Sequence, residues 1–144
     1  MPAGETFDIR TTTRNEVIDV TALVRAAVRK SGVASGIACV FCPHTTAGLT
    51  IQENSDPRVR ADLTEHLARL VPPDGPYATA DGNSDSHIKS TLVGASLTLI
   101  VDGGKPVLGT WQAVYFCEFD GPRSRLLMVR VVPDHAGGAP APGR

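Results

Sequence analysis

Residues 37–57, IACVFCPHTTAGLTIQENSDP, join an apolar run to a strongly polar segment within one short piece of chain. The apolar run 37–42 is typical of a central strand that is buried on both faces. Asp56 and Pro57 are the residue types favoured at the N-cap and at the first position of a helix. The stretch therefore predicts a buried strand that is followed, a short distance later, by a helix.

The polar segment 44–56 is expected to form the connection between the strand and the helix. Such a junction turns side chains and free backbone N–H groups toward a ligand. A turn followed by a helix cap explains residues 54–56 equally well. It does not explain His44 and Glu53, which we take as candidate catalytic residues, with Thr45 and Thr46 beside them as candidate binding residues.

The rest of the chain supplies strands and helices in an order that predicts an α+β fold. Hydrophobic period and turn residues predict strands over 5–13, 17–20, 97–101, 107–119 and 126–132, and helices over 21–31, 56–70 and 84–93. In the last helix we expect Ile88 and Leu92 to point inward. Consecutive strands near the C-terminus favour a mixed, mostly antiparallel sheet packed by two to three helices. We expect one domain over residues 1–133 and a disordered tail rich in Ala, Gly and Pro over 134–144.

Composition excludes several classes of protein. The chain has 144 residues, 42% of them apolar, and a net charge of −1, with few aromatic residues. A nucleic-acid-binding protein would normally show a basic face, and a membrane protein an apolar run of about 18 residues or more. We therefore expect a cytoplasmic protein with small-molecule partners. Cys39 and Cys42 fall on opposite faces of the predicted strand, which argues against a shared zinc or redox site.

A second polar cluster lies at residues 81–90, DGNSDSHIKS, where a Gly-Asn loop meets a helix N-terminus. The free amides of a helix N-terminus and its dipole favour a bound phosphate. Asn83, Ser84 and Lys89 are therefore candidate substrate-binding residues, and His87 is a candidate catalytic residue. An ordinary capped helix with a solvated lysine explains the same residues about equally well.

A third cluster follows in two pieces, GTWQ at 109–112 and DGPRSR at 120–125. Trp111 and Gln112 suit the wall of a pocket, although the tryptophan could equally pack in the core. Arg123 and Arg125 have the same strand parity, so both can project to one side and hold an anion. A pair of solvated charges at a sheet edge is the equal alternative.

Taken together, these motifs resemble those of the YjbQ family, described as secondary thiamine-phosphate synthases. The resemblance rests on HTTAGLTIQENSDP from His44, GNSDSHIKS from Gly82, GTWQ from Gly109 and DGPRSR from Asp120, and it spans residues 5–132. It implies a small α+β domain that forms a homotrimer. It also implies a weak activity that joins a hydroxymethyl-pyrimidine diphosphate to a thiazole phosphate with release of pyrophosphate, so that the substrate is a small phosphorylated heteroaromatic compound.

The resemblance also bears on metal binding. Members of the family commonly have a histidine two residues after the tyrosine of the Pro-rich loop, but here Thr79 stands two residues after Tyr77. His44 and His87 with a third histidine would suit zinc. An oxygen ligand from Glu53, Asp81 or Asp85 would instead favour magnesium.

Two functional hypotheses use the same residues. In the first, an enzyme holds phosphate with its arginines and the amides near Asn83, while His44, His87 and Glu53 transfer protons or bind a divalent metal, Mg or Zn. In the second, the same cleft binds a small ligand or a metal without catalysis. A purely structural protein would leave the three polar clusters unexplained.

Overall fold

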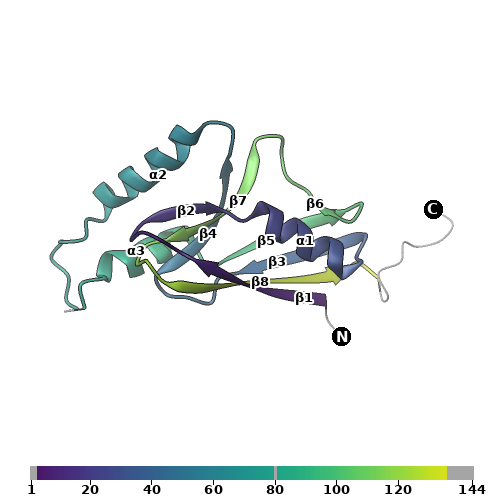
Figure 1. The fold of residues 1–144 in the computed structure, drawn as a ribbon, viewed down its shortest axis with the longest axis horizontal. Helices are drawn as coiled ribbons and strands as arrows, with labels where there is room; N and C mark the ends of the chain where they lie inside the picture. Colours follow the sequence, from purple (N-terminus) through teal and green to yellow (C-terminus); the bar gives the residue numbers. More distant parts are fainter. Residues whose placement is uncertain (1–2, 80, 136–144) are drawn as a thin grey trace.

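The computed structural model describes residues 3–79 and 81–135. It shows the predicted α+β architecture, with three helices and two antiparallel sheets (Figure 1). Five strands form one sheet in the order β1-β8-β3-β5-β6, and three form the other in the order β2-β7-β4. The elements are β1 Ala3–Arg10, β2 Glu16–Asp19, α1 Thr21–Ser31, β3 Ser35–Phe41, β4 Ala47–Glu53, α2 Pro57–Leu70, α3 Ser84–Val93, β5 Ser96–Asp102, β6 Lys105–Pro106, β7 Gln112–Glu118 and β8 Ser124–Pro133.

The hydrophobic core joins one face of each sheet to α1. Helix α1 buries Val24 and Val28 and contacts β1, β6 and β8 of the larger sheet and β7 of the smaller one. The sheets contribute further buried apolar residues, among them Val40, Leu127, Val129, Leu49 and Phe116. One continuous core therefore holds the two sheets together.

The larger sheet has an outer face that the sequence did not predict. Strand β3 alternates between buried and exposed residues, so the prediction that residues 37–42 are buried on both faces is wrong. Ile37 and Phe41 are both 41% exposed, because β3 pairs antiparallel with β5 and β8 and the described elements cover one face of the sheet. Cys39 lies on this exposed face and Cys42 is buried, as the strand parity predicted.

Strand β4 replaces the predicted direct junction between strand and helix. Residues 47–53 form a full strand that pairs with β7 along its whole length, from Ala47 opposite Glu118 to Glu53 opposite Gln112. The alternation of apolar and polar residues in AGLTIQE is the signal for this strand, but the polar flanks obscured it. The polar segment 44–56 is therefore divided between the two ends of a strand.

Helix α2 begins as predicted but packs differently. The side chain of Asp56 caps it by accepting a hydrogen bond from the backbone N–H of Arg58 at 3.0 Å. None of its residues is fully buried, although Leu63 and Leu67 form an apolar stripe. In Figure 1 the helix stands away from the two sheets. A hollow of about 240 Å³ lies beneath it, lined by apolar side chains that include Leu63, Leu67 and Leu92.

Helix α3 buries polar residues where apolar ones were expected. Ile88 and Leu92 are 40% and 57% exposed, so the prediction that they point inward is wrong. The face that packs against β4 instead carries Ser90, whose hydroxyl donates to the carbonyl oxygen of Ala47 at 2.7 Å. Polar groups with fixed partners can occupy such a face because each donor and acceptor is satisfied.

The described residues extend two positions past the predicted end of the domain at residue 133. Asp134, which the sequence assigned to a disordered tail, donates its backbone N–H to the carbonyl oxygen of Ser35 at 3.0 Å. The remainder of the predicted tail, residues 136–144, lies outside the described residues. Within the part of the chain that the structure describes, no helix has the length and apolar character needed to cross a membrane.

Candidate functional site

Three segments that are distant in sequence meet in one polar cleft of about 340 Å³. They are the turn between β3 and β4, the first turn of α3 with its N-cap, and the loop from β7 to β8. The cleft is lined by Pro43, His44, Thr45, Thr46, Asn83, His87, Asp120, Arg123 and Arg125. It thus contains seven of the residues that the sequence proposed for a site.

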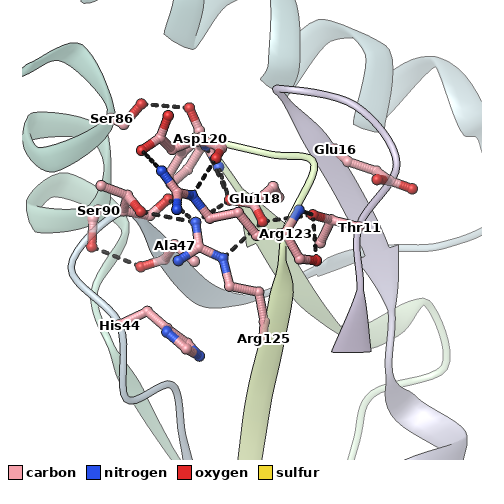
Figure 2. Close-up of polar contacts among 12 residues, drawn as sticks. Thr11, Glu16, His44, Ala47, Ser86, Ser90, Glu118, Asp120, Arg123 and Arg125 are labelled. Atoms are coloured by element: carbon pink, nitrogen blue, oxygen red, sulfur yellow. Dashed lines mark hydrogen bonds and ion pairs between the residues drawn. The ribbon is translucent and has the colours of Figure 1, made fainter. Parts of the chain in front are cut away.

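Arg125 lies at the base of the cleft, held by a buried carboxylate (Figure 2). Its Nε donates to Glu118 Oε1 at 2.8 Å, and its Nη2 donates to Glu118 Oε2 and to the hydroxyl of Thr46. Glu118 is fully buried and Arg125 is 5% exposed. Glu118 Oε2 also accepts the backbone N–H of Asp120 at 3.0 Å, and its Oε1 accepts the hydroxyl of Thr11 at 2.8 Å.

This arrangement leaves one nitrogen of Arg125 for a ligand. Nη1 has no partner among the described residues, and the side chain lines the cleft. Burial alone would raise the pKa of Glu118, but the hydrogen bonds from Arg125, Asp120 and Thr11 outweigh it and hold that pKa below its ordinary value. Glu118 is therefore ionised at neutral pH, and Arg125 is fixed in position as well as charged.

His44 is held in a single tautomer by the backbone of β8. Its Nε2 accepts the N–H of Leu126 at 2.8 Å, so in the neutral ring the proton lies on Nδ1. Burial lowers the pKa of His44, and the charge of Arg125 lowers it further. At neutral pH His44 is thus a neutral hydrogen-bond donor through Nδ1, which has no partner within residues 3–79 and 81–135.

Asp120 and Arg123 form the rim of the cleft on the side of the β7–β8 loop. Asp120 Oδ2 accepts from Arg123 Nη2 and from Asn83 Nδ2, each at 3.0 Å. Arg123 Nε also donates to the carbonyl oxygen of Asp120 at 2.7 Å, so the exposed guanidinium is oriented by its own loop. His87, one turn into α3, is exposed at the same rim.

Gly121 allows this loop to take its path. A Cβ atom at this position would lie 2.2 Å from the carbonyl oxygen of Thr13 and 2.9 Å from a side-chain carbon of Glu118. No larger residue fits without moving the backbone that carries Asp120 and Arg123. The glycine of the DGPR motif therefore serves the site through close packing.

The cleft does not fit the predicted metal site. The lone pair of His44 Nε2 accepts a backbone N–H, and its Nδ1 carries a proton, so neither nitrogen is free for a metal. Asp85, a proposed oxygen ligand, is buried between Arg14 and Lys89. Among the described residues, three potential ligand atoms come together at Asp62, Glu65 and His66 on the exposed surface of α2, and none of these lines the cleft.

Three predicted residues lie at the opposite end of the smaller sheet. Glu53 pairs with Gln112 at the far ends of β4 and β7, six residues from the ends at the cleft, which corresponds to about 20 Å. Trp111 precedes Gln112 and is 61% exposed. In the monomer, therefore, Glu53, Trp111 and Gln112 do not share a site with His44 and His87.

Two predicted residues of α3 also fall outside the cleft. Lys89 is 1% exposed, and its Nζ donates to Asp85 Oδ2 at 3.1 Å. The same carboxylate group accepts two hydrogen bonds from Arg14. Lys89 is therefore part of a buried ion pair and cannot reach a substrate. Ser84 is the first residue of the helix, which has Asn83 as its N-cap, and it does not line the cleft.

Sequence reasoning missed Glu118 and Asp120. Glu118 is the last residue of β7, in which all residues after Gln112 are buried. An acidic side chain in such a strand needs a buried partner. Arg125, seven residues later, is that partner; the sequence alone favoured equally an arginine that holds an anion and a solvated charge at a sheet edge. Asp120 was part of the recognised DGPRSR motif, but only the arginines were considered as ligands.

Comparison with known proteins gives consistent results. The family model described as UPF0047 protein YjbQ-like matches residues 5–134. A UPF0047 protein of Methanocaldococcus jannaschii is 48% identical over 128 residues, which cover 89% of this chain and 93% of the relative. The UPF0047 protein YugU of Bacillus subtilis is 45% identical over 129 residues, which cover 89% and 98%.

Solved structures agree with the fold. A YjbQ/UPF0047 protein from Clostridium acetobutylicum, described as an orthologue of YugU, has a TM-score of 0.87 at 48% identity and covers 89% of this chain and 99% of its own. A YbjQ-like protein of unknown function from Sulfolobus solfataricus has a TM-score of 0.85 at 29% identity, with 89% and 94% covered.

These comparisons overturn one expectation. The resemblance implied a thiamine-phosphate synthase, but the relatives named above are described as UPF0047 proteins, and the Sulfolobus protein as one of unknown function. None of these descriptions mentions thiamine. The assignment of that reaction to this chain is wrong.

Proposed function

The chain belongs to the YjbQ-like UPF0047 family, and we propose that it is an enzyme that binds a phosphorylated small molecule in the cleft between β3, α3 and β8. One observation supports this proposal above the others. Arg125 is buried and held by Glu118, yet Nη1 remains without a partner among the described residues. A buried guanidinium with one nitrogen open to a cleft is arranged to receive an anion.

Neighbouring groups favour a phosphate as that anion. The exposed guanidinium of Arg123 and the Nδ1–H of His44 line the same cleft, as does the start of α3. Arginines and helix N-termini recur in phosphate sites because each presents N–H donors in a positive field. These donors need no movement to meet negative charge on a reacting phosphate, so they would favour a transition state in which that charge increases.

His44 and His87 take different roles in this proposal. His44 is a fixed donor, since the N–H of Leu126 occupies its Nε2. His87 is exposed at the rim, and its side chain has no hydrogen-bond partner in the described part of the chain. His87 is therefore the residue we expect to exchange a proton with the substrate.

Binding is tested by thermal unfolding with increasing phenyl phosphate at pH 6, where about half of the ester still carries a P–OH group because the second pKa of a phosphate ester is about 6. A ligand that binds the folded state raises the melting temperature as its concentration exceeds Kd. We expect a shift for the wild-type chain, a much smaller one for Arg123→Ala, and an unchanged one for Arg69→Ala, which removes an exposed arginine of α2 outside the cleft. A wild-type chain that shows no shift at millimolar ligand would refute the proposal.

Catalysis is tested separately with a panel of phosphorylated heteroaromatic compounds followed by phosphorus NMR. We expect His87→Ala to lower turnover about a hundredfold or more, the usual cost of removing a positioned acid or base. His66→Ala is the matched control, because His66 is exposed on α2 outside the cleft. If the chain binds these compounds but turns none of them over, it is a binding protein and the proposal of an enzyme is wrong.

We further propose that the chain assembles as a homotrimer through the outer face of the larger sheet. That face exposes six large apolar side chains, 37–61% exposed, namely Ile37, Phe41, Ile100, Leu126, Met128 and Val132. Exposed apolar side chains that gather on one face of a sheet favour an interaction site, and contact with copies of the same chain would cover them. Light scattering tests the assembly, and a wild-type chain that is monomeric at micromolar concentration would contradict it.

A further inference from the structure

We propose that Asp120 makes the cleft selective for a phosphate group that still carries a proton, so that the site distinguishes phosphate from sulfate. The inference rests on the proposed function, because it requires an oxyanion in this cleft. It adds the class of anion that the site accepts.

The evidence is an acceptor oxygen among donors. Asp120 lines the cleft, and its side chain is 15% exposed. Its Oδ2 is occupied by Asn83 Nδ2 and Arg123 Nη2, which fix the orientation of the carboxylate. Its Oδ1 has no hydrogen-bond partner among the described residues, and this oxygen is not fully buried. This oxygen is therefore open to a ligand.

Asn83 Oδ1, buried and without a partner among the described residues, is a second acceptor at the cleft, but it is uncharged and does not repel an anion as a carboxylate does. The groups of the cleft that attract an anion are donors. They are Nη1 of Arg125, the Nδ1–H of His44 and the guanidinium of Arg123. At neutral pH sulfate carries no proton and presents acceptor oxygens alone, whereas inorganic phosphate carries at least one P–OH group. A sulfate oxygen facing Asp120 Oδ1 would be repelled, but a P–OH group at the same place donates a hydrogen bond to it.

A simpler role for Asp120 is to hold Arg123, to which it is bonded through both its carboxylate and its carbonyl oxygen. The two roles predict different results. If Asp120 only supports Arg123, its loss should weaken the binding of phosphate and the binding of sulfate by similar factors. Loss of the acceptor changes their ratio, because the negative charge opposes one anion and receives a hydrogen bond from the other.

The experiment is isothermal titration at pH 7 and constant ionic strength with inorganic phosphate and with sulfate. We expect the wild-type chain to bind phosphate about tenfold or more tightly than sulfate, the size of one charge-assisted hydrogen bond gained. In Asp120→Asn the ratio should fall toward one as sulfate binding improves. Asp74→Asn, the same change at an exposed position outside the cleft, should keep the wild-type ratio.

Each other outcome is decisive. Equal affinities in the wild-type chain would overturn the selectivity while leaving the phosphate site in place. If both anions bind Asp120→Asn more weakly but the ratio of phosphate to sulfate affinity is unchanged, Asp120 serves only to hold Arg123. Binding of neither anion by the wild-type chain would remove the proposed function itself.

Discussion

Glu118→Gln tests whether the buried carboxylate supports both the fold and the cleft. Glu118 accepts hydrogen bonds from Thr11, from two backbone N–H groups and from two nitrogens of Arg125. Glutamine has nearly the same shape but only one acceptor oxygen, and its amide nitrogen would face further donors. The substitution also leaves the charge of Arg125 without its buried partner.

The expected cost follows from these contacts. Removing one partner of a buried ion pair typically costs about 3 to 5 kcal/mol in the free energy of unfolding. For a chain of this length that corresponds to a melting temperature lower by about 10 to 16 °C. We also expect weaker phosphate binding, because Arg125 loses the contacts that aim its Nη1 at the cleft.

Urea unfolding of the wild-type chain and of Glu118→Gln from pH 7 to pH 3 provides the assay. The folded-state pKa of Glu118 is lowered, so its stabilisation is present above the unfolded-state pKa and is lost as pH falls through the folded-state pKa. The difference between the two proteins should therefore be largest at pH 7 and shrink below about pH 4. A loss of stability under about 1 kcal/mol at pH 7 would refute the description of this ion pair.

Two further predictions concern the histidine and the buried lysine. Nitrogen-15 NMR at pH 7.5 should show His44 protonated on Nδ1 and bare on Nε2, because the N–H of Leu126 donates to Nε2; the opposite tautomer would remove His44 as a donor to the ligand. Lys89→Met should lower stability by about 3 kcal/mol by breaking its buried pair with Asp85, which keeps Arg14 as a partner. Its phosphate affinity, measured by titration, should stay within about twofold of wild type, since a hydrogen bond lost to a charged ligand would cost more; a larger loss would return Lys89 to the binding site.

Local signals in the sequence predicted the parts of the fold that depend on local structure. Asp56 before Pro57 correctly placed the start of α2, because capping involves only neighbouring residues. The strand predicted over 97–101 is β5, and Gly103 and Gly104, both with positive φ, form the turn that follows it. In each case the physical requirement lies within a few residues of the signal.

The predictions that failed depended on partners far away in sequence. Lys89 was predicted either to bind substrate or to be solvated. Its partner Asp85 lies one helical turn away, but the helix face that carries both is buried by segments far away in sequence, among them Arg14 and β4. Glu53 was grouped with His44 because they share one motif, but β4 carries them to opposite ends of the sheet. Residues that are close in sequence are also close in space when they lie in a turn. In a strand, each residue adds about 3.3 Å, so residues only six positions apart are about 20 Å apart.

The candidate site was predicted in outline from three separate motifs. Polar residues at the ends of strands and at a helix start marked the right loops, and seven of the candidate residues line one cleft. The charge state and orientation of those residues could not be predicted, because they depend on Glu118 and on the N–H of Leu126.

The Glu118–Arg125 pair also links the two sheets mechanically. Glu118 ends β7 of the smaller sheet, Arg125 lies in β8 of the larger one, and Thr11, which follows β1, donates to the same carboxylate. Separating the two sheets would leave a buried charge without its partner. Local unfolding of one sheet while the other stays folded therefore costs free energy. The amide hydrogens of β7 and β8 should therefore exchange with solvent as a single cooperative unit, and an anion bound to Arg125 should slow the exchange of both strands together.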